Sequence, residues 1–454
     1  MPFRKLQNRP APDEKTHLGP RALIDAVNGY IKVQEGKTQL KSTPRYLRLV
    51  VKSIEQAIHA KENGNFYAVH STEFPIELFW PLGITPLLNE LYSTIICLVG
   101  NGNEPHHSDA DDIGFSRGTC LPYRTFYGMA EAGKWPVPDF VARCSSQCDP
   151  VSKREEMATG CMEIPGFGLD RPFKILTPQG MDYFAKEHRA LVQFLEERTG
   201  RVMDYDYLKE VTQLSFRATQ VYREINELRG KVPCPLPAEA SFAPMAVYGA
   251  WAGTQICVDF LEQLRDELQD RVDRGIGAVP DEKFRCTCAT SLPFLDCGIM
   301  AQAERRYGAV GVMDHLQWWR DDADWLIDSD DPVASLAYRV QFEAFDARRG
   351  TALHYVEQMR QAAVQCRADA VVYFGNPGCR LAAGGRRTLT DAFERSLGLP
   401  WTAIDCDPLG RSPSAHDEAM AQLDVFFASL EKSDSYQRSH RQRILHPGTG
   451  MTTA

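Results

Sequence analysis

Short apolar segments that alternate with helix-patterned segments in the C-terminal third are the feature that most restricts the fold. Residues 284–291, 309–314, 368–374 and 401–405 are apolar and strand-like, and segments with helical spacing of apolar residues separate them. Strands that alternate with helices form parallel sheets whose two faces are both covered. We therefore predict an α/β fold for this region.

The N-terminal half shows the same alternation with longer helices. Strand-like segments occur at 66–70 and 139–143, the apolar spacing over 19–63 and 207–227 predicts helices, and the mostly apolar segment 77–99 is expected to form a buried helix. We expect two Rossmann-like parallel-sheet lobes around a central site, with helical N-terminal and connecting segments. The expected divisions are a helical N-terminal arm (1–64), a first α/β lobe (65–232), a helical connector (233–282), a second α/β lobe (283–430) and a flexible tail (431–454).

The composition argues against several classes of partner. The chain has 454 residues and a net charge of −9, without the basic character that is typical of nucleic-acid-binding proteins. No apolar run reaches the ~18–20 residues that span a membrane, and no apolar core of a signal peptide is visible. We therefore expect a cytoplasmic protein that binds neither nucleic acid nor membrane. Thirteen cysteines in such a chain point to thiols, catalysis or metal rather than to disulfides.

Three cysteines, Cys120, Cys148 and Cys379, stand in distinctive local sequences. Cys148 and Cys379 each follow a strand-like segment, and open α/β sheets bind ligands outside the carboxyl ends of their strands. Small turn-forming residues precede Cys120 and Cys379, so the backbone can approach a bulky group there. The three thiols would meet at one iron–sulfur cluster, and three cysteines on four irons would leave one iron for a substrate oxygen. Three unrelated loop thiols are the alternative, and Cys144 competes with Cys148 for the second position.

Several other residues leave two interpretations open. Cys286, Cys288 and Cys297 either bind additional metal or pack in a buried sheet, because Cys-x-Cys on a strand places both sulfurs on one face. His106 and His107 lie in a polar segment that is either a solvated loop or a metal or acid–base site. Packing is expected for Cys97, Cys161, Cys234, Cys257, Cys366 and Cys406.

His315 follows the strand-like segment 309–314. At that sheet edge it would face a site as a proton donor, with Trp318 and Trp319 as the wall for an aromatic substrate. Core packing of these residues is the alternative.

Four segments resemble one known family in their order and spacing. They are 73–84 (E-F-P-I-E-L-F-W-P-L-G-I), Cys148-Asp149 with 164–172, 369–379, and 398–407. From about residue 65 to 430 the chain is similar to the cluster-binding subunits of 2-hydroxyacyl-CoA dehydratases and benzoyl-CoA reductases. The chain length and the segment 242–251 look more like the reductase subunits, whereas Cys286-Thr-Cys288 departs from them.

The resemblance implies roles for particular residues. Cys120, Cys148 and Cys379 would ligate a [4Fe-4S] cluster. Glu73, which lies in the resembling motif, is a candidate catalytic residue, and Glu73 and Glu77 would either orient substrate or cap a helix. His315 is the other candidate catalytic residue, because of its place after the strand-like segment 309–314. The implied partners are an acyl-CoA substrate, a related second cluster subunit that completes a heterodimer, and an ATP-hydrolysing iron–sulfur activator.

The leading functional prediction is a benzoyl-CoA-reductase-like subunit that performs one-electron reduction of a thioester-activated substrate. The nearest alternative is an (R)-2-hydroxyacyl-CoA dehydratase subunit, whose electron is recycled. A cluster subunit that transfers electrons without a substrate of its own, and a metal-free Rossmann-type binding protein, are alternatives of a different class.

Overall fold

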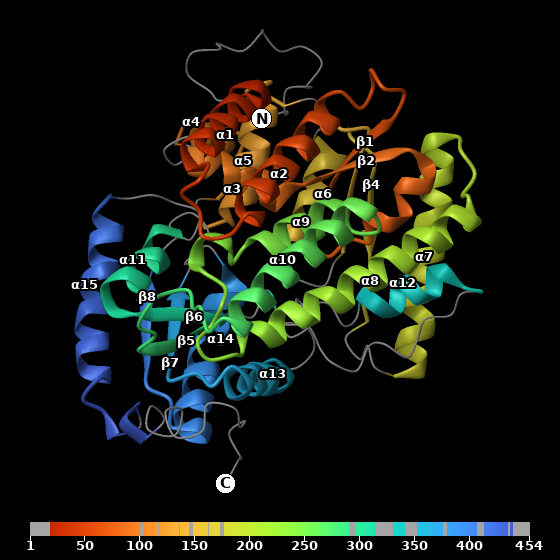
Figure 1. Ribbon diagram of the computed structural model, residues 1–454. Coiled ribbons are helices and arrows are strands. Elements are labelled where there is room, and N and C mark those ends of the chain that lie inside the picture. The colour runs from red at the N-terminus through yellow and green to blue at the C-terminus, as the bar shows by residue number, and fades with distance from the viewer. Residues whose placement is uncertain are drawn as a thin grey trace.

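Two four-stranded parallel sheets form the framework of the molecule (Figure 1). The computed structural model describes residues 19–99, 104–116, 118–135, 137–144, 149–161, 163–172, 177–289, 297–314, 317, 330–340, 352–375, 379–405, 413–434 and 436–438. The first sheet has the order β2-β1-β3-β4 and the second β6-β5-β7-β8. The strands are β1 (Phe66–His70), β2 (Ile84–Leu88), β3 (Phe140–Cys144), β4 (Gly166–Leu169), β5 (Phe284–Ala289), β6 (Ala309–Asp314), β7 (Ala370–Gly375) and β8 (Trp401–Asp405). The predicted α/β fold with two parallel-sheet lobes is therefore confirmed.

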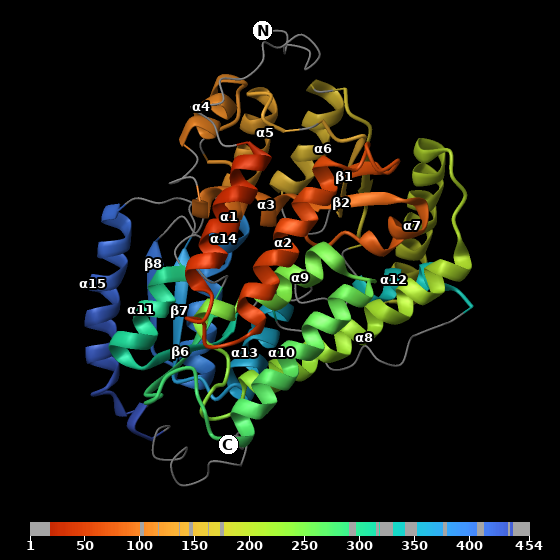
Figure 2. The same cartoon turned by 45° about the horizontal axis from the view of Figure 1, so that its top comes forward.

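Helices cover the two sheets and connect them. α3, α6 and α7 contact the first sheet, whereas α11, α14 and α15 contact the second, where α15 lies on the outside of the molecule (Figures 1 and 2). The helices are α1 (Pro20–Gln34), α2 (Ser42–Ile58), α3 (Asn89–Val99), α4 (Glu104–Asp112), α5 (Leu121–Glu131), α6 (Asp149–Cys161), α7 (Pro178–Thr199), α8 (Tyr205–Arg229), α9 (Ala243–Trp251), α10 (Gln255–Asp273), α11 (Cys297–Tyr307), α12 (Pro332–Val340), α13 (Ala352–Gln365), α14 (Arg380–Ala392) and α15 (Pro413–Leu430). None of the helices in the described part of the chain is long and apolar enough to cross a membrane.

The segment 77–99 does not form one helix, so that prediction was wrong. It contains two short 3₁₀ turns, η2 (Ile76–Leu78) and η3 (Trp80–Leu82), followed by β2 and α3. Pro81 and Pro86 lack the amide hydrogen that a helix interior needs, and Gly83 adopts a φ of +60° after the second turn. Pro86 is tolerated in β2 because this strand lies at the edge of its sheet.

The second sheet is buried on both faces. Val371 and Tyr373 belong to the large apolar core, which also includes the first lobe and the connecting helices. Val372 and Phe374 belong to a smaller core that includes side chains of α11 and α15. Because side chains alternate along a strand, β7 separates these two cores.

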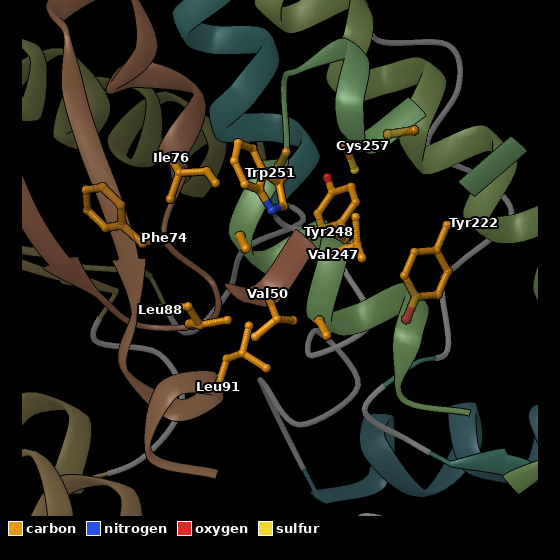
Figure 3. Packing of buried hydrophobic residues seen from close by; sticks show 14 of the residues in the cluster. Val50, Phe74, Ile76, Leu88, Leu91, Tyr222, Val247, Tyr248, Trp251 and Cys257 are labelled. Atoms are coloured by element: carbon orange, nitrogen blue, oxygen red, sulfur yellow. The ribbon is translucent and has the colours of Figure 1, made fainter. Parts of the chain in front are cut away.

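The connecting helix α9 packs against the first lobe. Figure 3 shows Trp251 of α9 between Tyr248 of the same helix and Ile76 of the first lobe. The rings of Trp80 and Trp251 stack with centroids 6.4 Å apart, and the Trp80 indole nitrogen donates to the Ala252 carbonyl at 2.7 Å. These contacts hold the turn after β1 against the connector.

The long helix α8 links the two lobes (Figure 2). It packs along α10, contacts η2 and η3, and reaches β6 at its far end. Arg285 of β5 is fully buried, and its guanidinium donates to the carbonyls of Gly230 at 3.2 Å and Lys231 at 3.0 Å. The last carbonyls of a helix have no partner within the helix. Arg285, which also pairs with Glu282, therefore anchors the end of α8 to the second sheet.

Candidate active site

The carboxyl end of the first sheet brings together the segments after β1 and β3. The backbone N–H of Cys144, the last residue of β3, donates to the Ser71 hydroxyl at 3.3 Å. Ser71 and Glu73 follow β1 and are fully buried. Glu73, a predicted catalytic residue, thus lies in a buried segment at the edge where open α/β sheets bind ligands.

Cys120 lies close to this edge through contacts between α3 and α5. The Ser93 hydroxyl of α3 donates to the Pro122 carbonyl at 2.9 Å, and the Tyr123 hydroxyl is hydrogen-bonded to the Glu90 carboxylate. Because α3 begins directly after β2, these bonds bring the start of α5 to the carboxyl side of the first sheet.

Cys120 and Cys379 occupy the same kind of local position. Each is the N-cap of a helix, Cys120 of α5 and Cys379 of α14, and neither side chain caps its helix. Both are partly exposed. The first N–H groups of a helix lack partners within the helix, and proteins bind anionic groups at this position. Cys379 follows β7, so this second thiol stands at the carboxyl side of the second sheet.

Two predicted site residues lie outside the described residues. Cys148 falls in sequence between β3 and α6, and His315 follows Asp314, the last residue of β6. Within the described ranges, no group of three or more His, Cys, Asp or Glu side chains could hold a metal ion. Since Cys148 is not among them, the three-cysteine site stays a prediction.

The competing cysteines occupy packing positions. Cys144 is fully buried within the large apolar core. Cys286 and Cys288 are fully buried in the smaller core, on the face of β5 that α11 and α15 cover. This arrangement fits the packing interpretation of the Cys-x-Cys pair. The Cys297 side chain is not among the side chains that the structure describes. As predicted, Cys234, Cys257 and Cys366 are also fully buried.

His106 and His107 lie in helix α4 rather than in a solvated loop. His107 Nε2 is 3.3 Å from the Thr125 hydroxyl of α5. Burial and the nearby Arg124 guanidinium lower the pKa of His107 to about 4, so its imidazole is neutral near pH 7. The two helices cross closely at Gly128, where an added Cβ would lie 1.7 Å from the His106 carbonyl oxygen. This position requires glycine.

Asp314 and Arg229 form a buried polar contact that the sequence pattern did not reveal. Arg229 Nη2 lies 3.6 Å from Asp314 Oδ2, and the Gln317 amide donates to the same oxygen at 2.6 Å. Asn226 of α8 donates to the Gln317 carbonyl at 2.6 Å. The carboxyl end of β6 is therefore tied to the last turn of α8.

Asn89, the first residue of α3, was also missed. It is fully buried, and within the described part of the chain its side-chain amide has no hydrogen-bond partner. A buried, unpaired amide is costly. Its position directly after β2, on the carboxyl side of the first sheet, fits a site that binds a polar group. Soft thiols and amide donors are the surroundings that iron–sulfur clusters require, so the described residues fit such a group.

The fold and the site describe an α/β protein with thiols at the carboxyl sides of two parallel sheets. The family model described as "2-hydroxyglutaryl-CoA dehydratase, D-component" matches residues 71–430, and the chain belongs to this family.

Relatives include components of two kinds of enzyme. The (R)-phenyllactyl-CoA dehydratase alpha subunit of Clostridium sporogenes is 23% identical, over 87% of this chain and 98% of the relative. The alpha subunit of lactoyl-CoA dehydratase from Anaerotignum propionicum is 25% identical, over 82% and 93%. A benzoyl-CoA reductase subunit of Thauera aromatica is 22% identical, over 72% and 80%. The chain is thus related to components of lyase and oxidoreductase complexes.

Proposed function

We propose that this chain is the cluster-binding subunit of an enzyme that dehydrates a 2-hydroxyacyl-CoA. The supporting observation is the shared position of Cys120 and Cys379, each at a helix N-terminus on the carboxyl side of its sheet, in a chain of the dehydratase family. Cys120, Cys148 and Cys379 would hold a [4Fe-4S] cluster. When bound, this cluster supplies one-electron chemistry and an iron with an open position.

Benzoyl-CoA-reductase-type reduction, the leading prediction from the sequence, is the second candidate. The segment 242–251 favours it, and so does the match to the reductase of Thauera aromatica. The two dehydratase subunits, however, match larger shares of this chain, 87% and 82% against 72%. We therefore place the dehydratase first.

The chain's own residues would bind and orient the thioester and exclude water from it. Glu73, buried at the carboxyl edge of the first sheet, would present a carboxylate to the acyl group. His315 would donate a proton from the carboxyl side of the second sheet. The proposed partners are a related cluster subunit that completes a heterodimer and an ATP-hydrolysing iron–sulfur activator.

Anaerobic purification with analysis of iron and acid-labile sulfide tests the cluster. We expect about four irons and four sulfides per chain, as a single four-iron cluster requires. Cys120→Ala, Cys148→Ala and Cys379→Ala should each lower this content, whereas the matched control Cys286→Ala should retain it. A wild-type chain that contains no iron after anaerobic reconstitution would contradict the proposal.

Turnover of defined CoA thioesters distinguishes the two reactions. The cluster-loaded chain, with its partner subunit and a low-potential reductant, is given a 2-hydroxyacyl-CoA or benzoyl-CoA, and the products are identified. An enoyl-CoA product supports the dehydratase. Reduction of the aromatic ring would instead establish the second candidate. A cluster that responds to neither thioester would indicate an electron-transfer subunit.

A further inference from the structure

The carboxylate of Glu77 is bonded to side chains of two helices, and a third helix is bonded to one of these side chains. Glu77 lies in η2, after β1, and is fully buried. Arg339 of α12 places Nη2 2.7 Å from Glu77 Oε1, and the Ser215 hydroxyl of α8 donates to the same oxygen. Tyr248 of α9 accepts a hydrogen bond from Arg339 Nη1. The turn after β1 is thereby fixed to α8, α9 and α12 at one point.

The packing around Glu77 leaves little room for movement. An added Cβ on Gly253, where φ is +79°, would lie 2.9 Å from Glu77 Cγ and 2.6 Å from Val211 Cγ1. Figure 3 shows Cys257 and Tyr248, which pack in the same core, as neighbours. Glu77 is therefore held within the core rather than at the surface.

Arg339 reaches Glu77 from a distant part of the sequence. It is 1% exposed, and its guanidinium stands over the Tyr248 ring at 5.7 Å from the centroid. The arginine fork can bond Glu77 and Tyr248 at the same time, which a lysine ammonium cannot do with the same geometry. Arg339 thus sets the orientation of Glu77 as well as balancing its charge.

We propose that Arg339 is a positioning residue for the reaction, acting through Glu77 on the segment 71–78. This segment carries Glu73, and its Ser71 is bonded to the end of β3. The inference rests on the proposed function, because Glu73 is the group that would meet the acyl-CoA. A displacement of about 1 Å at a reacting group can lower a rate by about 100-fold.

The test compares Arg339→Lys with Arg285→Lys in the complete, cluster-loaded complex. Arg285 is an equally buried arginine paired with a glutamate, but it anchors the end of α8 to the second sheet. We expect Arg339→Lys to lower kcat about 10-fold or more with KM for the thioester changed less than about 2-fold. Arg285→Lys should keep kcat per cluster near the wild-type value. Hydrogen exchange of segment 71–78 should become faster only in Arg339→Lys.

Equal kcat and equal exchange of segment 71–78 in the two variants would overturn the inference. If Arg339→Lys does not fold, Ser215→Ala removes one bond to Glu77 without removing a charge, and its kcat should fall with KM retained; an unchanged kcat would overturn the inference. A wild-type complex that transforms no CoA thioester instead contradicts the proposed function. In that case, hydrogen exchange of segment 71–78 in Arg339→Lys and Arg285→Lys still decides whether Arg339 holds this segment in place.

Discussion

The guanidinium of Arg339 lies 2.7 Å from the carboxylate of Glu77, and both side chains are buried. The pair joins α12 to the turn after β1, and α8 contributes Ser215 to the same carboxylate. Desolvation makes such a pair a modest source of stability, but loss of one partner leaves a lone buried charge. The pair therefore constrains the arrangement of these elements more than it stabilises the fold.

Arg339→Met should destabilise the chain by about 3–5 kcal/mol, because Glu77 would stay buried without a counterion. Adding Glu77→Gln should recover part of this loss, so the two changes should not be additive. Denaturant unfolding of both variants gives the free energies. Lys186→Met, which removes an exposed pair with Asp182, is the control and should change stability by less than about 0.5 kcal/mol. Additive losses would contradict the prediction.

Gly128→Ala should destabilise the contact between α4 and α5, since the new Cβ would meet the His106 carbonyl at 1.7 Å. Overpacking of this kind costs about 1–3 kcal/mol or more. Gly29→Ala is the matched control: Gly29 lies inside α1 with no atom near its added Cβ, and alanine should stabilise that helix by about 0.5–1 kcal/mol. Thermal unfolding measures both, and a Gly128→Ala variant as stable as wild type would refute the close crossing.

His188 should make stability fall as pH is lowered. Burial lowers its pKa to about 4, below the ordinary value of 6.5, so the unfolded chain binds the proton first. The contribution is complete above pH 6.5 and is lost as pH falls toward 4, at up to about 1.4 kcal/mol per pH unit. As pH falls from 6.5 toward 4, the unfolding free energy of the wild type should fall more steeply than that of His188→Gln, so that the two values converge or cross. A constant difference would show that His188 does not titrate this way.

Glu304 should act in the opposite direction. Burial raises the pKa of its carboxyl to about 8, from an ordinary value of 4.5, so the folded chain retains the proton longer than the unfolded chain. Its contribution is complete below pH 4.5 and is lost as pH rises toward 8. Glu304→Gln keeps an acceptor for the Ala238 N–H, which is 2.8 Å away. This variant should gain stability relative to wild type from pH 6.5 to 8; no gain would contradict the assignment.

Cys288→Ala should leave iron and sulfide content unchanged and lower stability by about 1 kcal/mol, because the thiol is packed in the smaller core. Metal analysis and denaturant unfolding check both parts. Cys234→Ala, which changes another buried thiol, is the control. A loss of iron in Cys288→Ala alone would support additional metal at Cys286, Cys288 and Cys297.

Local sequence patterns predicted most elements because their causes are local. The apolar runs at 309–314 and 401–405 form β6 and β8, and the periodicity of 207–227 lies within α8. The pattern failed over 77–99, where apolar residues continue through two turns, a strand and a helix. A segment buried on all sides carries no periodicity that separates strand from helix.

The amino-acid sequence by itself determined the α/β class and the family, and it predicts Cys120, Cys148 and Cys379 as the cluster ligands. Only the tertiary structure decided that the start of α5, next to Cys120, is bonded to α3, that Cys286 and Cys288 face a core, and that Arg339 meets Glu77. The physical reason is that strand alternation and helix propensity act between neighbours in the chain. Ion pairs and buried hydrogen bonds instead depend on which distant surfaces pack together.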